Sequence, residues 1–464
     1  MKVLYLYSGD RAETFHGVPG VDFPDTQWYG QNHFVDLGIE ADYKDGMSAA
    51  PRVLRNLLGF RLRHLFLFFS TRKYDIVYGS ALLYMIVLKK FIPTRAKYVL
   101  FNISLLRTLR VHSHRTLYRK SLEYLLKELD GIVCVSTAQK QWLESTYPYL
   151  SGKVFVVPLG VDVSFYHPVF SDRSSTVLAV GRDDGRDYAT LIEVARQLPD
   201  HSFEIVCSRR NLAGIHAIPP NVRVYYDMPL LDLYKKYQSA ALMLIITHSD
   251  TYTDGADCSG QTVLLDSMAN GIPVIVTRRA YLDEYVRDGV DARIIEAYDT
   301  GGIIAAINEL SHDEQLRYQL ATNARRRVES SLSTKRMAQH LASVFRSIFV
   351  VRLIDMKLLY IYSGLRKGRY QGDLGKDYPD TRFWGKNHMS AYGIDAETLE
   401  WTDIAPLWVR KIIGFRLQHL FMFFASRRYD VVFGPSLLYM MALHVVIPSK
   451  AKYVLFNTSL VRTL

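Results

Sequence analysis

The clearest chemical signal in the chain is a helix that starts with small polar residues. It lies in residues 259–277, SGQTVLLDSMANGIPVIVT, and its first backbone N–H groups come from Ser259, Gly260, Gln261 and Thr262. Such N–H groups lack partners within the helix and carry the positive end of its dipole, so they suit a diphosphate. Asp266 follows on the same helix, where its carboxylate can accept hydrogen bonds from ribose hydroxyls. The alternative is an ordinary capped helix with a solvated aspartate.

A second signal is a glycine turn flanked by two arginines. Residues 180–188 read VGRDDGRDY, in which a strand leads through Gly181 into a helix that we expect to begin near Tyr188. Arg182 and Arg186 follow the carboxyl end of that strand, where two guanidinium groups can clamp a pyrophosphate. The alternative is a pair of surface arginines balanced by the neighbouring carboxylates of Asp183, Asp184 and Asp187.

Strands that alternate with helical periodicities must position both signals. The strands predicted in the first part of the chain are residues 2–7, 74–79, 97–102 and 131–136. A second alternating series consists of residues 153–158, 176–181, 203–208, 222–227, 242–247 and 272–277. Alternation of this kind predicts parallel sheets with helices on both faces. We expect two doubly wound halves joined near residue 150, with ligands bound in the cleft at the carboxyl ends of the strands.

The composition is that of a globular protein rather than a disordered or fibrous one. Of the 464 residues, 49% are hydrophobic and 22% are charged, and the formal net charge is +11. A positive charge favours nucleic acid, anionic membrane or phosphorylated ligands, but the chain has no dense Lys/Arg tail, so we expect no nucleic-acid partner. The cysteines, Cys134, Cys207 and Cys258, form no CxxC pair, which argues against a zinc ribbon and fits a reducing compartment.

The hydrophobic segments predict peripheral contact with a membrane at most. No stretch is long enough to span a bilayer, and the N-terminal MKVLYLYSGD predicts a strand rather than a secretory signal, so we expect a cytoplasmic protein. Residues 52–69 form a predicted helix with Arg52, Arg55 and Arg63 opposite an apolar side. A basic amphipathic helix can lie on the anionic inner face of a membrane. The alternative is a helix packed against the sheet.

The first 109 residues recur near the C-terminus at a constant offset of 355 residues. KYVLFNISLLRTL at 97–109 recurs as KYVLFNTSLVRTL at 452–464, and 56 of the 109 paired positions are identical. We interpret this as one complete protein followed by a truncated copy of its N-terminal domain, from a truncated or fused reading frame; the alternative is a purposeful half-domain. We expect an N-terminal domain, a C-terminal domain, a crossover helix with linker, and the partial repeat, at residues 1–150, 151–333, 334–355 and 356–464.

Together these motifs resemble the retaining GT-B glycosyltransferases of the group 1 family, glycosyltransferase family 4. Four motifs of the family have counterparts in this chain. Its P-x-G-V-D strand corresponds to VVPLGVDVSFYHP at 156–168, and its Gly-Arg turn to VGRDDGRDY at 180–188. Its D-x-x-L-x-x-x-Y helix corresponds to DMPLLDLYKKYQSA at 227–240, and its E-A-M-A-x-G-x-P-V-I signature to DSMANGIPVI at 266–275. The family's last helix crosses back onto the first domain. Residues 334–349 suit that helix, with a buried stripe of Met337, Leu341, Val344 and Ile348.

The resemblance implies a hexosyltransferase that moves a sugar from a nucleotide-diphosphate sugar to an acceptor hydroxyl with retention of anomeric configuration. Its α/β fold would consist of two Rossmann-like domains facing a cleft and a partial third. Arg182 and Arg186 would hold the diphosphate and Asp266 the ribose, with Gly181 and residues 259–262 against the phosphates. No metal or other cofactor is expected, because arginines and helix N–H groups can stabilise the leaving diphosphate. The expected acceptor is a lipid-linked or cell-surface glycan, as in polysaccharide biosynthesis.

One departure from the family concerns its pair of glutamates eight positions apart. Asp266 stands at the second position and Cys258 at the first, while Asp254 and Asp257 are nearby carboxylates that can substitute if the loop is rearranged. Two other readings therefore remain open. One is a non-catalytic protein that binds nucleotide sugars or acts as a scaffold, and the other is a different GT-B enzyme such as a nucleotide-sugar epimerase.

The first domain offers further candidates but no clear catalytic residue. Ser8 and Gly9 follow the first strand at the sheet's carboxyl edge and recur in the second copy, and glycine there permits close approach of a ligand. Many family members carry a histidine after the fourth strand, but here that strand runs into Asn102, and His112 comes ten residues later. Arg107 lies between them and can meet a phosphate. The alternative for all of these residues is a structural role.

Overall fold

The structure is a computed structural model that describes residues 1–7, 15, 17–45, 67–80, 82–92, 94–112, 114–170, 174–354, 357–362, 389, 395–400, 423–434, 437, 440 and 451–455. The chain divides into two compact units. One consists of Met1–Leu88 and Ala96–Phe345, and the other of Lys89–Arg95 and Arg346–Leu464. Ser8, Gly9 and residues 52–66 of the predicted amphipathic helix lie outside the described residues. Within the described ranges, no helix has the length and apolar character that a membrane span requires.

A six-stranded parallel sheet organises the first part of the larger unit, in the order β2-β1-β3-β4-β5-β6. Its strands are β1 (Lys2–Leu6), β2 (Glu40–Lys44), β3 (Ile76–Gly79), β4 (Lys97–Asn102), β5 (Gly131–Cys134) and β6 (Val154–Val156). The helices that follow them are α4 (Leu83–Phe91), α5 (Leu105–Val111), α6 (Thr116–Lys127) and α7 (Thr137–Thr146). Strands β3 and β5 are buried along their whole length, because helices cover both faces of the sheet.

Two strands of this sheet differ from the expectation. Strand β2 was not predicted, because its sequence EADYK carries charged residues at alternate positions and lies at the sheet edge, where no apolar run is needed. The strand at 153–158, which we expected to open the second series, is β6 and pairs with β5 instead. The chain therefore passes from the first sheet to the second after residue 156 and not near residue 150, which corrects that expectation.

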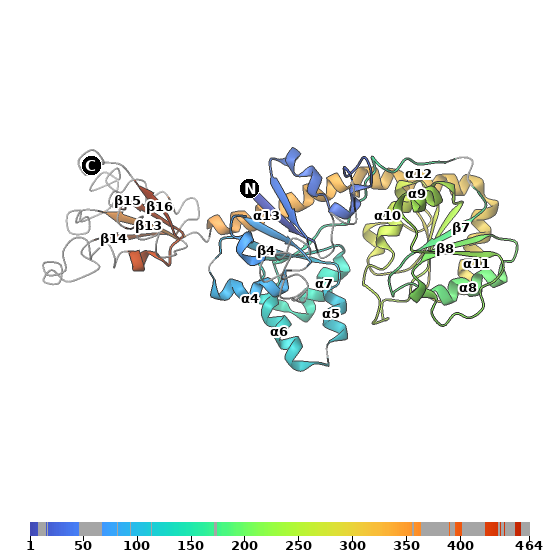
Figure 1. The fold of residues 1–464 in the computed structure, drawn as a ribbon, viewed down its shortest axis with the longest axis horizontal. Helices are drawn as coiled ribbons and strands as arrows, with labels where there is room; N and C mark the ends of the chain where they lie inside the picture. Colours follow the sequence, from blue (N-terminus) through green and yellow to red (C-terminus); the bar gives the residue numbers. More distant parts are fainter. Residues whose placement is uncertain are drawn as a thin grey trace. The chain divides into compact units, whose positions relative to one another are not determined.

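A second six-stranded parallel sheet follows, in the order β12-β11-β10-β7-β8-β9. Its strands are β7 (Val177–Val180), β8 (Phe203–Cys207), β9 (Val222–Tyr226), β10 (Leu242–Ile245), β11 (Val274–Thr277) and β12 (Arg293–Ile295). Its helices are α8 (Tyr188–Gln197), α9 (Leu230–Ser239), α10 (Gln261–Ala269), α11 (Thr300–His312) and α12 (Glu314–Ser331). Figure 1 shows α8 and α11 on one face of the sheet and α10 and α12 on the other. The predicted pair of doubly wound halves is thus confirmed.

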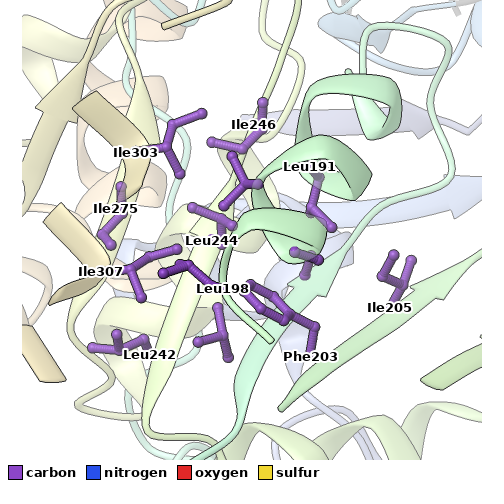
Figure 2. Packing of buried hydrophobic residues seen from close by; sticks show 14 of the residues in the cluster. Leu191, Leu198, Phe203, Ile205, Leu242, Leu244, Ile246, Ile275, Ile303 and Ile307 are labelled. Carbon is purple, nitrogen blue, oxygen red and sulfur yellow. The ribbon is translucent and has the colours of Figure 1, made fainter. Parts of the chain in front are cut away.

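The core of this second half forms where helices pack on the sheet. Ile303 and Ile307 of α11 meet Leu242 and Leu244 of β10, and Leu191 of α8 joins the same cluster (Figure 2). All five side chains are buried. Burying a side chain of this size stabilises the fold by about 1.5–3 kcal/mol, so the cluster fixes the strand ends that carry the candidate site.

Short 3-10 helices connect several of these elements, and a long helix follows α12 and runs beyond the end of the larger unit at Phe345. The 3-10 helices are Asp25–Trp28, Gln31–His33, Val35–Leu37, Pro148–Leu150, Arg209–Leu212 and Leu282–Glu284. The long helix is α13 (Thr334–Ile354), whose Phe345 ring lies 5.9 Å from that of Phe34 and 5.2 Å from that of Tyr78, measured between centroids. It thus packs on the first sheet, as a crossover helix would. The buried stripe of α13 differs from the predicted one at one position, because Phe345 is buried whereas Val344 is half-buried.

The smaller unit contains a four-stranded parallel sheet in the order β14-β13-β15-β16. Its strands are β13 (Lys357–Tyr362), β14 (Asp395–Glu400), β15 (Val431–Gly434) and β16 (Lys452–Leu455). Lys357 pairs with Asp395 as Lys2 pairs with Glu40, so the register of the first sheet is reproduced at the offset of 355. The predicted partial third domain is therefore present as a third Rossmann-like sheet.

Candidate functional site

The N-terminus of α10 lies beside the carboxyl end of β10. Its N-cap, Gly260, has a φ of +87°, and a Cβ atom there would lie 2.7 Å from the Ile245 side chain, so only glycine fits. The N–H groups of Ser259 and Gln261 donate to the backbone oxygens of Ala256 and Cys258 at 3.1 Å. They are therefore not available to a ligand, contrary to the expectation for all four residues at 259–262.

Three N–H groups at this helix start have no partner in the described part of the chain. They belong to Gly260, Thr262 and Val263. Such N–H groups and the positive end of the helix dipole can together hold an anion, so the start of α10 is a candidate anion site.

Arg186 brings a buried positive charge to the same place. Its side chain is 4% exposed, and its Nε donates to Oδ2 of Asp183 at 2.9 Å. A Cβ atom on Gly181 would lie 2.8 Å from Nη2, and one on Gly260 would lie 3.4 Å from Nη1, so the guanidinium packs against two glycines. Burial disfavours the charge, but Asp183 more than offsets it and the pKa of Arg186 is raised. This arginine is therefore the cation of the candidate anion site.

Asp183 connects the glycine turn to the start of α10. Its carboxylate accepts the Gly185 N–H at 3.1 Å and the Ser259 hydroxyl, besides Nε of Arg186. Burial works against its ionisation, but the charge of Arg186 and these hydrogen bonds outweigh burial and lower the pKa of Asp183. Asp183 therefore balances Arg186 and sets its direction, a role that the sequence suggested only in part.

Two buried polar atoms near the anion site lack partners among the residues that the structure describes. They are Oγ1 of Thr247 and Nε2 of Gln261. Thr247 is 1% exposed and Gln261 is 3% exposed. Thr247 follows β10 and forms a bridge with the backbone of Arg186. A buried polar group without a hydrogen bond costs about 1–3 kcal/mol, so both atoms point to a ligand that supplies the missing partners. Thr247 was not among the predicted site residues, although it is the last residue of the strand predicted at 242–247.

Arg182 is not part of the same constellation as Arg186. Its side chain is 55% exposed, its Nη2 donates to the Met228 carbonyl at 3.3 Å, and its Nε lies 3.8 Å from Asp227. The neighbouring Tyr226 ring lies 4.8 Å from the guanidinium carbon of Arg209. Arg182 therefore faces the loop after β9, whereas Arg186 lies beside the start of α10. The two arginines of the predicted clamp thus have different surroundings.

The carboxylate of Asp266 lies beside the hydroxyl of Tyr166, a buried residue. Burial raises the pKa of Asp266 to about 7, although a hydrogen bond with the Tyr166 hydroxyl works in the opposite direction. Its Oδ1 atom is buried and has no partner among the described residues. Burial also raises the pKa of Tyr166 well above its usual range, and the carboxylate of Asp266 adds to that shift. An incoming hydroxyl donor can therefore satisfy Oδ1.

The loop before α10 does not contain a simple replacement for the family's first glutamate. Cys258 accepts a hydrogen bond from Nε2 of Gln139 at 3.3 Å, and burial raises the pKa of its thiol to about 12, so the thiol is neutral. Asp257 pairs with Arg110. Asp254 is exposed and has no partner in the described ranges. Of the candidates in this loop, Asp254 is thus the carboxylate that remains available.

The first half contributes mostly structural residues at the predicted positions. Asn102 is fully buried, where its Nδ2 donates to Cys134 and its Oδ1 accepts the Leu105 N–H that begins α5. Arg107 lies 3.8 Å from Asp184, and His112 packs edge-on to Tyr118, with Nδ1 buried and unpartnered among the described residues. Asn102 therefore positions α5 rather than facing a ligand.

Comparisons with known proteins agree with this architecture. The family model described as "Glycosyltransferase Family 4" matches residues 33–165, and the one described as "Glycosyl transferases group 1" matches residues 170–327. With the two parallel sheets, these matches support a glycosyltransferase of the GT-B fold. In the described ranges, no three His, Cys, Asp or Glu side chains are grouped as metal ligands.

Individual relatives are distant in sequence. YtcC of Bacillus subtilis (strain 168) is 24% identical over 251 residues, a match that covers 48% of this chain and 62% of YtcC. Sucrose-phosphate synthase from Thermosynechococcus elongatus has a TM-score of 0.58 at 16% identity, covering 76% of this chain and 100% of that one. HepE of Anabaena in complex with UDP-glucose has a TM-score of 0.56 at 15% identity, covering 75% and 100%. At these identities the structures show the shared fold alone.

Proposed function

We propose that the chain is a glycosyltransferase that uses a nucleotide-diphosphate sugar as donor. The observation that carries this proposal is the buried guanidinium of Arg186, packed between Gly181 and Gly260 beside the unpartnered N–H groups at the start of α10. A fixed cation and free helix N–H groups are what a leaving diphosphate needs as its charge grows. HepE, which has the same fold, was solved with UDP-glucose, a donor of this class.

The remaining site residues divide the donor between them. Asp266 accepts a ribose hydroxyl at Oδ1, and Thr247 and Gln261 give their unpartnered atoms to the diphosphate or the sugar. Arg182 and the loop after β9 line the edge for the base. In this arrangement Asp254 is the carboxylate that can reach a sugar hydroxyl, in place of the family's first glutamate.

The reaction that we propose proceeds with retention and without a metal. The bond between the anomeric carbon and the diphosphate oxygen breaks, and the acceptor oxygen bonds to that carbon on the face that the diphosphate leaves. The acceptor's proton passes to the departing diphosphate. Arg186 and the N–H groups of α10 stabilise the negative charge that a metal ion would otherwise neutralise. Activity should therefore survive EDTA, and a complete loss that magnesium or manganese restores would contradict the metal-free mechanism.

The acceptor that we propose is a lipid-linked or cell-surface glycan, met at an anionic membrane surface. This part of the proposal is supported by the net charge of +11 and by the basic amphipathic pattern at 52–69. Co-sedimentation with vesicles tests this part of the proposal, since the chain should bind vesicles that contain anionic lipid and not those that lack it. Binding to both kinds of vesicle, or to neither, would contradict it.

A panel of radiolabelled nucleotide sugars tests the function. We expect one donor to be turned over, either onto added acceptor or slowly onto water, and NMR of the product to show the donor's anomeric configuration. Tight donor binding without turnover on any acceptor would favour the alternative, a nucleotide-sugar binding protein in which Cys258 replaces a required glutamate.

A further inference from the structure

The loop that precedes α10 determines which N–H groups of that helix remain free. Ala256 and Cys258 supply the carbonyl oxygens that occupy the N–H groups of Ser259 and Gln261. If residues 250–258 changed shape, this pattern of occupied and free donors would change with them. The conformation of the loop is therefore part of the anion site, although most of its side chains lie outside that site.

Arg279 holds the loop from the second half of the larger unit. Its side chain is 6% exposed, and its Nε donates to Asp250 at 2.7 Å. Its Nη2 donates to the carbonyl oxygens of Asp257 and Ala256 at 3.2 and 3.4 Å. One buried arginine thus binds both ends of the loop.

Arg110 reaches the same loop from α5, the helix that follows β4 in the first half of the larger unit. It pairs with the Asp257 carboxylate, and its Nη1 donates to the Asp250 carbonyl at 3.3 Å. Burial and the nearby charge of Arg279 both lower the pKa of Arg110, and the negative charge of Asp250 works in the opposite direction. Removing one partner of a partly buried pair leaves the other charge uncompensated, which destabilises far more than the loss of an exposed pair.

A second residue from the first half supports the same loop. Gln139 of α7 is 3% exposed and accepts the Val135 N–H at 3.0 Å with its Oε1, which fixes the amide. Its Nε2 then donates to Sγ of Cys258 at 3.3 Å. The residue directly before Ser259 is therefore held from the first half as well.

We propose that Arg110 is a positioning residue for the anion site. By binding Asp257 and Asp250 together with Arg279, it holds residues 250–258 in the conformation that leaves the N–H groups of Gly260, Thr262 and Val263 free. The geometry couples the first half of the larger unit to diphosphate binding in the second half, with no contact between Arg110 and the ligand. The binding part of this inference rests on the proposed function; the loop-holding part does not.

The test exchanges the charges of the pair in the full-length chain. The variants are Arg110→Glu, Asp257→Arg and the double exchange, with the neutral pair Arg110→Gln and Asp257→Asn in case a charge reversal prevents folding. The matched control is Arg119→Glu, which breaks the pair of Arg119 with Glu123 on α6, a pair that is more exposed than that of Arg110 with Asp257. Hydrogen exchange of residues 250–263 is measured without ligand, and the Kd for UDP is measured on the same samples.

We expect each single reversal to accelerate exchange in residues 250–263 at least tenfold and to weaken UDP binding at least tenfold, while the double exchange recovers both to within about threefold of the wild type. Arg119→Glu should change neither. Single variants that behave as the wild type, or a folded double variant no better than the worse single variant, would overturn the proposal. If the wild type binds no nucleotide, the exchange data still decide the loop-holding role, and only the proposed function fails.

Discussion

Arg186 and Arg182 show how one sequence motif separates into two environments. Arg186 is buried and bound to Asp183, whereas Arg182 is exposed and faces the loop after β9. A charge-assisted hydrogen bond in a desolvated site contributes about 1.5–3 kcal/mol, and an exposed one contributes less. The two arginines should therefore differ in their importance for binding.

The first prediction is that Arg186→Ala weakens binding of UDP at least tenfold and that Arg182→Ala has a smaller effect. Isothermal titration of the folded variants measures both. Arg196→Ala is the control, because that arginine is exposed on α8 and pairs with Glu193. If Arg186→Ala binds UDP with the same affinity as the wild type, the proposed anion site is wrong.

The second prediction concerns Asp266, whose pKa of about 7 exceeds its ordinary value of 3.8. Between these values the folded chain keeps the proton that the unfolded chain has lost, so stability falls as the pH rises from about 4 to about 7 and then levels off. Asp266→Asn lacks this loss, because an amide does not titrate.

Urea unfolding at about pH 5 and about pH 7.5 measures this difference. Relative to the wild type, the urea midpoint of Asp266→Asn should be higher at about pH 7.5 than at about pH 5. Asp254→Asn, at an exposed carboxylate, should show no such gain. If the difference in urea midpoint between Asp266→Asn and the wild type is the same at both pH values, burial does not raise the pKa of Asp266.

At this scale the sequence predicted residue types better than residue partners. The glycines, Arg186 and Asp266 stand out because their types and spacing follow a chain-local pattern. The roles of Thr247 and Asp183 and the contact of Arg110 with Asp257 depend on segments that meet only after folding. No periodicity or spacing within one segment can show such contacts.

At the scale of elements, the helix start at Gly260 combines two requirements. The backbone needs a left-handed conformation, and a side chain there would meet Ile245 at 2.7 Å. Gly214 has a similar φ of +92° but no atom within 4 Å of a Cβ, so it isolates the first requirement.

The third prediction is that Gly260→Ala lowers stability more than Gly214→Ala does. Left-handed strain costs about 1–2 kcal/mol in both variants, and only Gly260→Ala adds a steric overlap. Urea midpoints of the two variants give the comparison. Equal losses would mean that α10 can shift without cost, and the glycine would then not fix the helix start.

Most elements were predictable because their strands are continuous apolar runs between turn residues. The exceptions have a common cause. Strand β2 is polar and lies at an edge, and β12 has only three residues, so neither presents an apolar run of useful length. The sheet to which β6 belongs could not be read locally, because pairing with β5 or β7 requires the same kind of sequence.

At the scale of the molecule, the candidate site lies entirely in the larger unit. The third sheet contains counterparts of β1 to β4 and none of the segments that carry Arg186 or Asp266. The fourth prediction is that a chain cut after Asp355 keeps its donor affinity and turnover, since α13 ends at Ile354 and stays whole. A cut protein that is folded by circular dichroism but inactive would show that residues 356–464 take part in the reaction.

The shared register of the first and third sheets has a kinetic consequence. A strand such as β2 has two compatible partners in one polypeptide, β1 nearby and β13 about eight times as far along the chain. Since the closure entropy of a loop grows with the logarithm of its length, the nearer partner is favoured by about 2 kcal/mol. That margin selects between two pairings that are alike in hydrogen bonding. Synthesis adds to it, because the first sheet leaves the ribosome long before its competitor exists.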